Sequence, residues 1–372
     1  DPRLISVIPS AVAEAAIKSG VARKKIIDLD SYKDELTNRL DPSMSLMQGI
    51  NAKVRKNPKR VIFAEGEDEN MLKAAIEFGR SKLGIPVLIG AENRVKEQLK
   101  KIGLDENYKI EIVNSTDKNK REKYVKHLYK KLQREGQLER DVDRLVRNDR
   151  IAWGSSMIAC KDADAMVTGN IRHYAASIEK LKKVVEARPG EEIFGMTMIV
   201  SKGKTILVAD TNVTELPSAE RLVNISKSCV RIARLFGFEP KVAFLSHSTF
   251  GKPLSRNTRH VRDAIEKLKK EKVDFDFDGE MQPDVALNPI YQEIYPFSKI
   301  VGNANVLIMP ALHSAAISTK LMKVFGGGKN IGPLLIGLGQ PIEVAPLRAS
   351  TSEILNLASI AAYSSDVIDY SN

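Results

Sequence analysis

The sequence is poor in cysteine and in aromatic residues. Its 372 residues include two cysteines, Cys160 and Cys229, which lie too far apart to form a metal-binding or redox motif. This usage is typical of a reducing compartment, so we expect a cytoplasmic protein. Phe, Trp and Tyr make up 6% of the residues and do not alternate with the basic segments. The stacking surfaces that single-stranded nucleic acids require are not evident, and we expect no nucleic-acid partner.

Long apolar runs and metal-ligand motifs are also missing. No apolar run reaches the length of a membrane span and the first residues lack a signal-peptide pattern, so we expect no membrane association. The segment Asp274–Gly279 matches the first half of a calcium loop, but Val285 occupies the position of the last carboxylate. We predict no metal site, because metal-ligand spacing is also absent among His127, His173, His247, His260 and His313.

Positive charge exceeds negative charge in this chain. The formal net charge is +11 and the isoelectric point is near 9.4, which favours an anionic partner such as a phosphorylated small molecule, a nucleic acid or a membrane. Much of the excess lies in Lys118–Lys131, where Val125 and Leu128 recur at helical spacing. This pattern favours a solvated helix face over a nucleic-acid groove.

Strand-like apolar runs alternate with helical patterns along the chain. The alternation predicts an α/β fold with largely parallel sheets covered by helices, and the length suggests two or three compact units. Strands are predicted at 60–64, 87–89, 110–113, 165–168, 196–200, 205–209, 241–245, 273–277, 305–309 and 334–336. Helices are predicted at 9–19, 28–40, 44–55, 69–82, 116–133, 218–236, 257–270 and 352–363.

The loop after the predicted strand 241–245 carries hydroxyls, a glycine and a lysine. Together with exposed backbone amides, such groups satisfy phosphate oxygens. A helix cap ahead of Asn257 explains the same composition equally well. The residues concerned are Ser246, Ser248, Thr249, Gly251 and Lys252.

A second polar cluster ends the predicted strand 273–277. Asp278, Glu280 and Gln282 follow this strand, which we expect to stop in a turn at Asp278-Gly279. Open α/β sheets bind ligands at the carboxyl ends of their strands, so the cluster is a candidate site. This interpretation is moderately favoured over a solvated loop.

The segment Gly332–Ser350 reads GPLLIGLGQPIEVAPLRAS. Gly332 and Pro333 end the preceding element, and a short buried strand follows. Gly337 and Gly339 permit a close approach by another backbone or by a ligand. Taken alone, the segment predicts a strand and a turn.

Ordered segments of the chain resemble the phosphate acetyl/butyryltransferase family, the phosphotransacetylases. They are AEGED (64–68), DADAMVTG (162–169), KVAFLSHSTFG (241–251), DGEMQPDVAL (278–287), NANVLIMP (303–310) and GPLLIGLGQP (332–341). The resemblance implies a two-lobed, three-layer α/β/α fold with largely parallel sheets, a cleft for CoA and acyl phosphate, and a homodimer or higher oligomer formed through this domain.

The first residues, DPRLISVIPSAVAEAAIKSGVA, resemble the closing segment of the bacterial malic enzyme catalytic domain. The combination resembles the long NADP-dependent malic enzymes, which carry a phosphotransacetylase-like domain at their C-terminus. It implies that NADP and a divalent metal bind in a malic enzyme domain outside this chain. The domains implied are a malic enzyme tail and linker at 1–52, lobe 1 at 53–190 plus 332–372, and lobe 2 at 191–331.

The positions that carry the chemistry of the family differ here. The resemblance places its catalytic serine and arginine at Pro346 and Leu347, which have neither a hydroxyl nor a charge. Arg348 lies one residue after the position of the family's arginine, and Lys320 matches a lysine of the family. Glu353 stands where the family has an aspartate. We therefore predict no catalytic residue in this chain.

Three hypotheses follow. The leading one is a domain without transferase activity that binds acetyl-CoA and regulates a malic enzyme domain, as an inhibitor, with no cofactor of its own. The alternatives are an active phosphate acetyltransferase, in which Arg348 and Ser350 or Thr351 replace the missing pair, and a structural dimerisation module. The predicted acyl-CoA and phosphate ligands are Ser246, Ser248, Thr249, Gly251, Lys252, Asp278, Glu280, Gln282, Lys320, Gly332, Pro333, Gly337 and Arg348.

Overall fold

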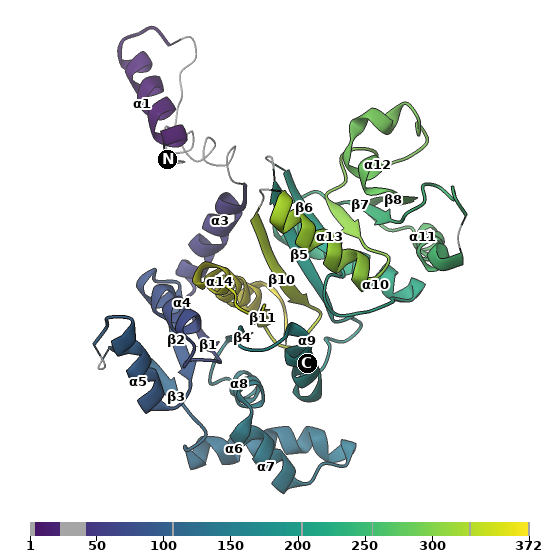
Figure 1. The fold of residues 1–372 in the computed structure, drawn as a ribbon. Helices are drawn as coiled ribbons and strands as arrows, with labels where there is room; N and C mark the ends of the chain where they lie inside the picture. The colour runs from purple at the N-terminus through teal and green to yellow at the C-terminus, as the bar shows by residue number, and fades with distance from the viewer. Residues whose placement is uncertain are drawn as a thin grey trace.

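The computed structural model describes residues 4–22, 42–105, 108–201, 204–254, 256–326 and 329–370 (Figure 1). Its strands are β1 (Lys59–Phe63), β2 (Gly84–Ile89), β3 (Glu111–Val113), β4 (Ala165–Gly169), β5 (Phe194–Ser201), β6 (Lys204–Ala209), β7 (Lys241–Leu245), β8 (Asp276–Met281), β9 (Val306–Ile308), β10 (Lys329–Ile336) and β11 (Ile342–Ala345). Its α-helices are α1 (Leu4–Lys18), α3 (Pro42–Lys56), α4 (Glu69–Arg80), α5 (Glu92–Lys101), α6 (Lys118–Leu132), α7 (Glu139–Asn148), α8 (Arg150–Ala159), α9 (Tyr174–Val184), α10 (Ala219–Leu235), α11 (Arg259–Glu271), α12 (Pro283–Leu287), α13 (Leu312–Phe325) and α14 (Thr351–Val367).

The first lobe is built on a parallel sheet with the strand order β11-β4-β1-β2-β3. Side chains alternate between its two faces, as the pleat requires. Val61 and Phe63 of β1 pack in the cluster that contains residues of α4 and α14, whereas Ile62 packs in the cluster that contains residues of α6 and α8. The lobe therefore has three layers, with helices on both faces of the sheet.

The second lobe is built on a sheet with the order β10-β5-β6-β9-β7-β8. The four adjacent strands β6, β9, β7 and β8 are parallel, while β5 and β10 run antiparallel to their neighbours. Val242 and Phe244 of β7 pack with residues of α10 and α11, whereas Ala243 and Leu245 pack with residues of α12 and α13. The predicted two-lobed α/β/α architecture with largely parallel sheets is confirmed.

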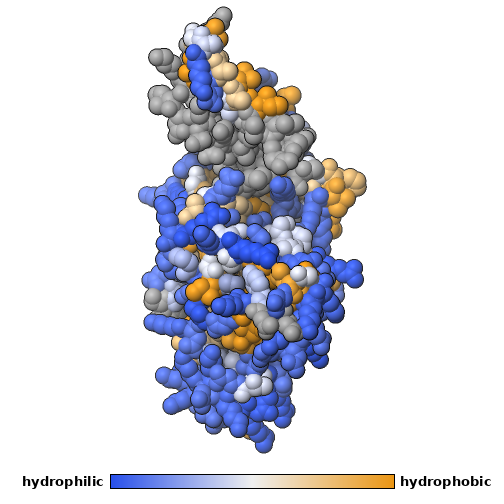
Figure 2. All heavy atoms as spheres, turned by 90° about the vertical axis from the view of Figure 1, so that its left-hand side faces the viewer, coloured by the Kyte–Doolittle hydropathy of each residue, from blue (hydrophilic) through white to orange (hydrophobic). Residues whose placement is uncertain are grey.

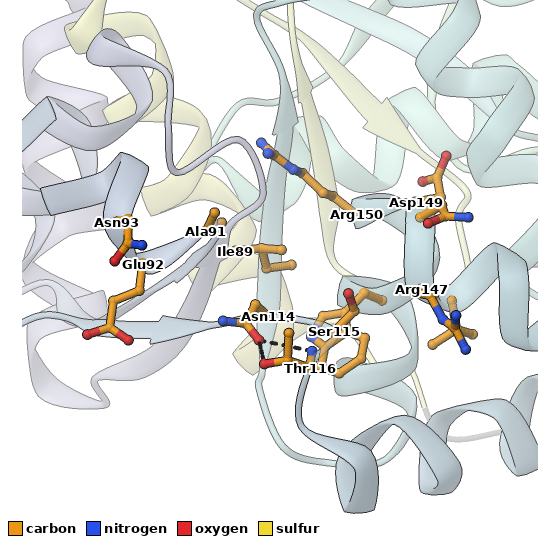
Figure 3. A pocket seen from close by; sticks show the side chains of 14 residues that line it. Ile89, Ala91, Glu92, Asn93, Asn114, Ser115, Thr116, Arg147, Asp149 and Arg150 are labelled. Carbon is orange, nitrogen blue, oxygen red and sulfur yellow. Dashed lines mark hydrogen bonds between the residues drawn. The ribbon is translucent and has the colours of Figure 1, made fainter. Parts of the chain in front are cut away.

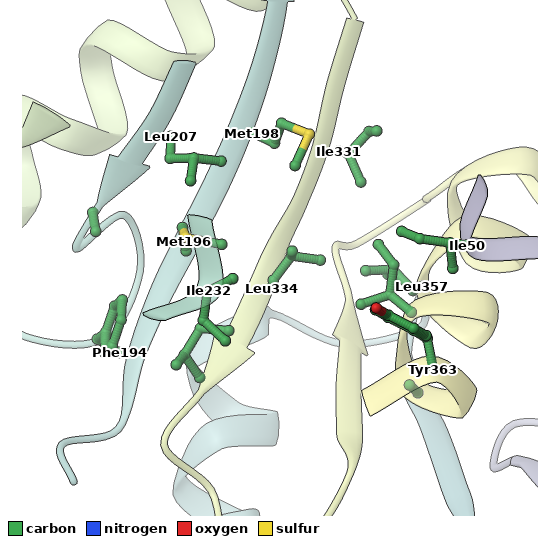
Figure 4. Close-up of a cluster of buried hydrophobic side chains, with 14 of the residues drawn as sticks. Ile50, Phe194, Met196, Met198, Leu207, Ile232, Ile331, Leu334, Leu357 and Tyr363 are labelled. Carbon is green, nitrogen blue, oxygen red and sulfur yellow. The ribbon is translucent and has the colours of Figure 1, made fainter. Parts of the chain in front are cut away.

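The lobes meet where the chain passes from β10 to β11. One hydrophobic cluster continues across this joint and contains Met196 of β5, Ile232 of α10, Leu334 of β10 and Leu357 of α14 (Figure 4). The change of sheet falls between Ile336 and Ile342, a few residues beyond the position 332 assigned from the sequence.

The prediction for the segment 273–282 was wrong in its details. The strand is Asp276–Met281, and it continues through Asp278 and Gly279 instead of turning there. Gly279 makes this continuation possible, because its φ of +145° suits glycine and a Cβ would lie 2.7 Å from the carbonyl oxygen of Phe244. The pairing with β7 shifts register at the same point.

The basic segment 118–131 forms a helix whose lysines lie on its exposed face, as predicted. In α6, Val125 and Leu128 are buried, whereas Lys123, Lys126 and Lys130 are exposed. Figure 2 views the molecule from the left-hand side of Figure 1 and shows hydrophilic side chains over most of its lower half. Among the helices that the structure describes, none combines the length and the apolarity needed to cross a membrane. The predicted helix 28–40 lies outside the described residues.

Candidate functional site

The two polar clusters predicted from the sequence lie side by side at the carboxyl ends of β7 and β8. The backbone N–H of Phe250 donates to the carbonyl of Glu280 at 2.7 Å. The side-chain amide of Gln282 donates to the carbonyl of His247 at 2.6 Å, and its backbone N–H donates to Thr249 Oγ1 at 3.2 Å. Neighbouring parallel strands end at the same edge of a sheet, which is why segments 30 residues apart meet here.

A buried polar network centred on Glu280 holds the loop after β7. Glu280 is 1% exposed and accepts the hydroxyl of Ser248 at 2.6 Å. Arg262 of α11 donates to both carboxylate oxygens at 3.1 and 3.2 Å, and the hydroxyls of Ser246 and Ser248 lie 3.0 Å apart. Because Ser248 and Glu280 are buried, their direct role is to shape the loop.

A cavity of about 620 Å³ opens beside this loop, at the carboxyl ends of β7 and β9. The chain runs from β7 to β8 on one side and reaches β9 on the other, so this is a topological switch point, where open α/β sheets bind ligands. Ser246, His247, His260 and His313 line the cavity together with residues around Pro310. The N-terminus of α13 lies at its wall, and its N-cap residue Ala311 provides no side-chain cap.

Four other predicted residues lie apart from the cavity wall. Asp278 accepts the hydroxyl of Ser298 and the backbone N–H of Lys299, each at 3.0 Å, and thereby holds the segment before β9. Lys252 is exposed at the end of the loop, and Lys320 is exposed on α13. Gly251 adopts a φ of +82° with open space around its Cα.

The predicted glycines of the segment 332–339 serve close packing within the protein. A Cβ on Gly337 would lie 1.9 Å from the carbonyl oxygen of Glu192, and one on Gly332 would lie 2.9 Å from that of Met196. Pro333 is buried in β10 beside them. The close approach expected at these glycines is therefore made by backbone.

The first lobe has its own switch point, between β1 and β4, and a buried carboxylate occupies it. Glu65 is 0% exposed and accepts the hydroxyl of Thr168 and the N–H of Gly169, each at 3.0 Å. Burial raises the pKa of Glu65 to about 7, and Arg172, 3.3 Å away, opposes this increase. The sequence analysis did not select Glu65, although it follows a buried strand within AEGED.

The end of β11 lies beside the same switch point. The backbone N–H of Arg348 donates to the carbonyl of Asn170, just beyond β4, at 2.9 Å. Leu347 is 45% exposed, and the side chain of Arg348 is exposed as well. The residue at the family's serine position, Pro346, provides neither a hydroxyl nor an N–H.

Glu353 of α14 has both carboxylate oxygens occupied. One oxygen accepts the backbone N–H and the hydroxyl of Ser350, each at 2.9 Å, in a capping box. The other accepts Lys323 of α13 at 2.8 Å, which joins the second lobe to the first. The pKa of Glu353 is lowered, because these hydrogen bonds together outweigh the opposing effect of its burial.

A further cavity of about 500 Å³ lies at the carboxyl ends of β2 and β3 (Figure 3). Asn93, Asn114, Arg147 and Arg150 contribute polar groups to its wall. Arg150 is paired with Glu67 at 3.0 Å. The sequence analysis missed this cavity, although Asn114 directly follows a predicted strand. Within the described part of the chain, no cluster of histidine, cysteine or acidic residues suits a metal ion.

Comparison with known proteins decides the family. The sequence pattern of the phosphate acetyl/butaryl transferase family matches residues 45–362. The chain belongs to this family. The resemblance inferred from the sequence is thereby confirmed.

Relatives of two architectures support the assignment. The phosphate acetyltransferase of Clostridium acetobutylicum is 31% identical over 85% of this chain and 97% of that protein. The solved phosphotransacetylase of Streptococcus pyogenes superposes with a TM-score of 0.78 at 28% identity, over 87% of this chain and 99% of that one.

The NADP-dependent malic enzyme of Rhizobium meliloti is 44% identical over 98% of this chain and 48% of that protein. The chain thus spans about half the length of the curated malic enzymes that it matches.

We expect Glu65→Gln to change how stability depends on pH. The pKa of Glu65 is about 7 in the folded protein and 4.5 ordinarily, so the folded state retains its proton more strongly between these values. The wild type therefore loses stability as pH rises from about 4.5 to 7, by roughly 3 kcal/mol from this group. Glutamine removes this component. Urea unfolding of both proteins at pH 5 and pH 8 measures the difference, and parallel pH profiles would contradict the assignment.

Proposed function

We propose that this chain is an acetyl-CoA-binding regulatory domain that does not transfer acyl groups and that controls a malic enzyme domain of the same protein. The observation that carries the proposal is the end of β11. Pro346 and Leu347 occupy the positions at which active relatives are expected to have a serine and an arginine, and neither can donate a hydrogen bond from its side chain to a phosphoryl group. A half-exposed leucine beside Asn170 gives no electrostatic assistance.

The hydroxyls and the carboxylate closest in sequence to the missing pair already have other partners. Ser350 caps α14 and binds Glu353, and Thr351 Oγ1 lies 3.5 Å from Asn70 Oδ1. Glu353 has no free carboxylate oxygen to act as a base, since Lys323 occupies the remaining one. Arg348 is the residue that most favours the alternative of an active transferase, because its exposed guanidinium lies at this edge.

The cavity beside the loop after β7 supports ligand binding without catalysis. Its volume of about 620 Å³ falls within the range of small-molecule sites. His247, His313 and the uncapped N-terminus of α13 supply hydrogen-bond donors for CoA phosphates, and the remaining wall is largely apolar. The net charge of +11 also favours an anionic ligand.

The malic enzyme relatives supply the proposed context. They are about twice as long as this chain, and the proposed parent protein combines it with malate oxidation that uses NADP and a divalent metal. Acetyl-CoA would inhibit by binding one state of the whole enzyme more tightly than another. A homodimer through this domain is part of the same proposal.

Calorimetry with acetyl-CoA, together with an assay of acetyl-CoA formation from acetyl phosphate and CoA, tests this proposal. We expect binding without turnover, and weaker binding by His313→Ala, which removes part of the cavity wall. His127→Ala, on α6 outside the cavity, is the matched control and is expected to bind normally. Turnover comparable to that of an active relative would establish the transferase alternative, whereas no binding at millimolar ligand would favour the dimerisation module.

The regulatory role is tested in the full-length parent by malate oxidation with and without acetyl-CoA. Inhibition that disappears when this domain is deleted supports the role. A response that survives the deletion would exclude it.

A further inference from the structure

Glu343 joins the edge strands of the two sheets. It lies on β11, which is the edge of the first sheet, and it accepts the backbone N–H of Leu335 on β10, the edge of the second sheet, at 2.9 Å. Its side chain is buried, with the residue 4% exposed. Within the described residues it has no ion pair. A single carboxyl group thus spans the junction between the lobes.

Two arginines line a small cavity together with this carboxyl group, and both are bound elsewhere. Arg231 of α10 donates to Glu191 at 2.8 Å through Nη2, and Arg188 also pairs with Glu191. Arg188 lies over the ring of Tyr370, 5.7 Å from its centroid. Arg188, Arg231, Tyr370 and Glu343 line one small cavity of about 20 Å³. This is enough space for one water molecule, which needs roughly 10–15 Å³.

The other ionisable groups that face the junction are acids. Tyr174 of α9 and Tyr370 of the C-terminal segment both have raised pKa values, because burial and the nearby Glu343 disfavour the phenolates. The hydroxyl of Tyr174 is buried without a hydrogen-bond partner in the described structure. Asp210, which also acts on Tyr174, is bound by backbone N–H groups, including those of Gly195 and Thr214. Burial raises the pKa of Glu343 to about 8, so its carboxyl group is protonated at neutral pH.

We propose that Glu343 is a proton-responsive joint between the lobes, and that Arg231 exchanges its partner Glu191 for Glu343 when the proton is lost. The protonated carboxyl group is compatible with the buried contact between β10 and β11. Once ionised, it requires a cation or water, and both are available across the 20 Å³ cavity that Tyr370 borders. The exchange would replace the hydrogen bond from β10 to Glu343 by an ion pair from α10 of the second lobe to β11 of the first. The two alternative ion pairs of Arg231 are the two states of this switch.

Hydrogen exchange of the Leu335 amide, corrected for its intrinsic pH dependence, tests the joint. If the joint opens only with release of the Glu343 proton, the equilibrium constant for opening rises about tenfold per pH unit up to pH 8 and is constant above it. We expect this slope for Leu335 in the wild type between pH 6 and 8, and none in Glu343→Gln, whose amide still accepts the N–H. The amide of Phe244 in β7 lies four strands away from β10 and reports global unfolding, so it is the internal control and is expected to exchange more slowly than Leu335 at every pH.

Two results would overturn the proposal. Equal exchange rates of Leu335 and Phe244 across this pH range would mean that the proton is released by global unfolding and not at a joint, and an unchanged slope of Leu335 in Glu343→Gln would exclude Glu343. The partner exchange has its own test in the double variant Arg188→Gln/Glu191→Gln, which frees Arg231 alone. Opening is then expected at lower pH than in the wild type, and an unshifted profile would exclude Arg231 as the incoming partner.

Discussion

Gly337→Ala is expected to lower the free energy of unfolding by more than about 4 kcal/mol, which is exceptional for one added methyl group. The new Cβ would lie 1.9 Å from the carbonyl oxygen and 2.7 Å from the carbonyl carbon of Glu192. Both are backbone atoms, so no rotamer change relieves the overlap. The carbonyl of Gly337 also accepts the N–H of Arg188 at 2.9 Å, which fixes the two segments together where the lobes join. Urea unfolding followed by circular dichroism measures the loss.

Gly190→Ala is the matched control for this substitution. Its φ of +74° resembles the +83° of Gly337, but a Cβ there meets no atom within 4 Å. The expected loss of stability is then only the free energy needed to hold an alanine in the left-handed backbone conformation, about 1–2 kcal/mol. Equal losses in the two variants would show that the backbone contact of Gly337 with Glu192 relaxes easily, which would contradict the close packing of these two segments.

Parallel-strand geometry explains why part of the candidate site was predictable. The sequence analysis expected polar ligands after β7 and after residue 277, and carboxyl ends of neighbouring parallel strands share an edge. The structure accordingly brings Thr249 and Gln282 into hydrogen-bond contact. The cavity beside them depends on β9 and α13, and α13 was not predicted. Its exposed apolar residues, such as Ile317 and Phe325, obscure the usual amphipathic pattern.

Buried carboxylates explain the main errors of the sequence-based prediction, both at the junction of the lobes and in the first lobe. The strand β11 was missed because Glu343 interrupts the apolar run Ile342–Ala345, and a glutamate normally marks an exposed position. Glu65 was not selected for the same reason. Whether a carboxylate is buried, and how far its pKa rises, depends on helices that are distant in sequence. Local pattern alone does not contain that information.

The prediction of the two lobes did not depend on which carboxylates are buried. The alternation of strands and helices predicts layered α/β units, and each predicted strand has a counterpart in the structure. The ends of β7 agree with the prediction, whereas each other predicted strand is shifted at one end or both. The helices α5, α7, α8 and α9 were missed. In α7 and α8 the turn is set by Asp149, which ends one helix and caps the next. Two short helices separated by one residue do not give the long periodic signal that sequence reasoning needs.

Glu280→Ala is expected to destabilise the protein by about 3–5 kcal/mol, because it leaves Arg262 without its buried partner. Glu280 is 1% exposed and also accepts the hydroxyl of Ser248, so its removal breaks the network that shapes the loop after β7. Urea unfolding measures the loss of stability. Glu266→Ala is the control on the same helix as Arg262, since its pair with Lys269 is exposed and contributes little.

The same variants separate support of the loop from direct ligand contact. Glu280 is buried beneath the loop, so we expect Glu280→Ala to weaken acetyl-CoA binding only through displacement of Ser246 and His247, which line the cavity. Glu280→Gln keeps an acceptor for Ser248 and is expected to retain more of both stability and affinity. A Glu280→Ala protein of wild-type stability and unchanged affinity would show that the network does not hold the loop. Lost affinity at unchanged stability would instead indicate that Glu280 meets the ligand itself.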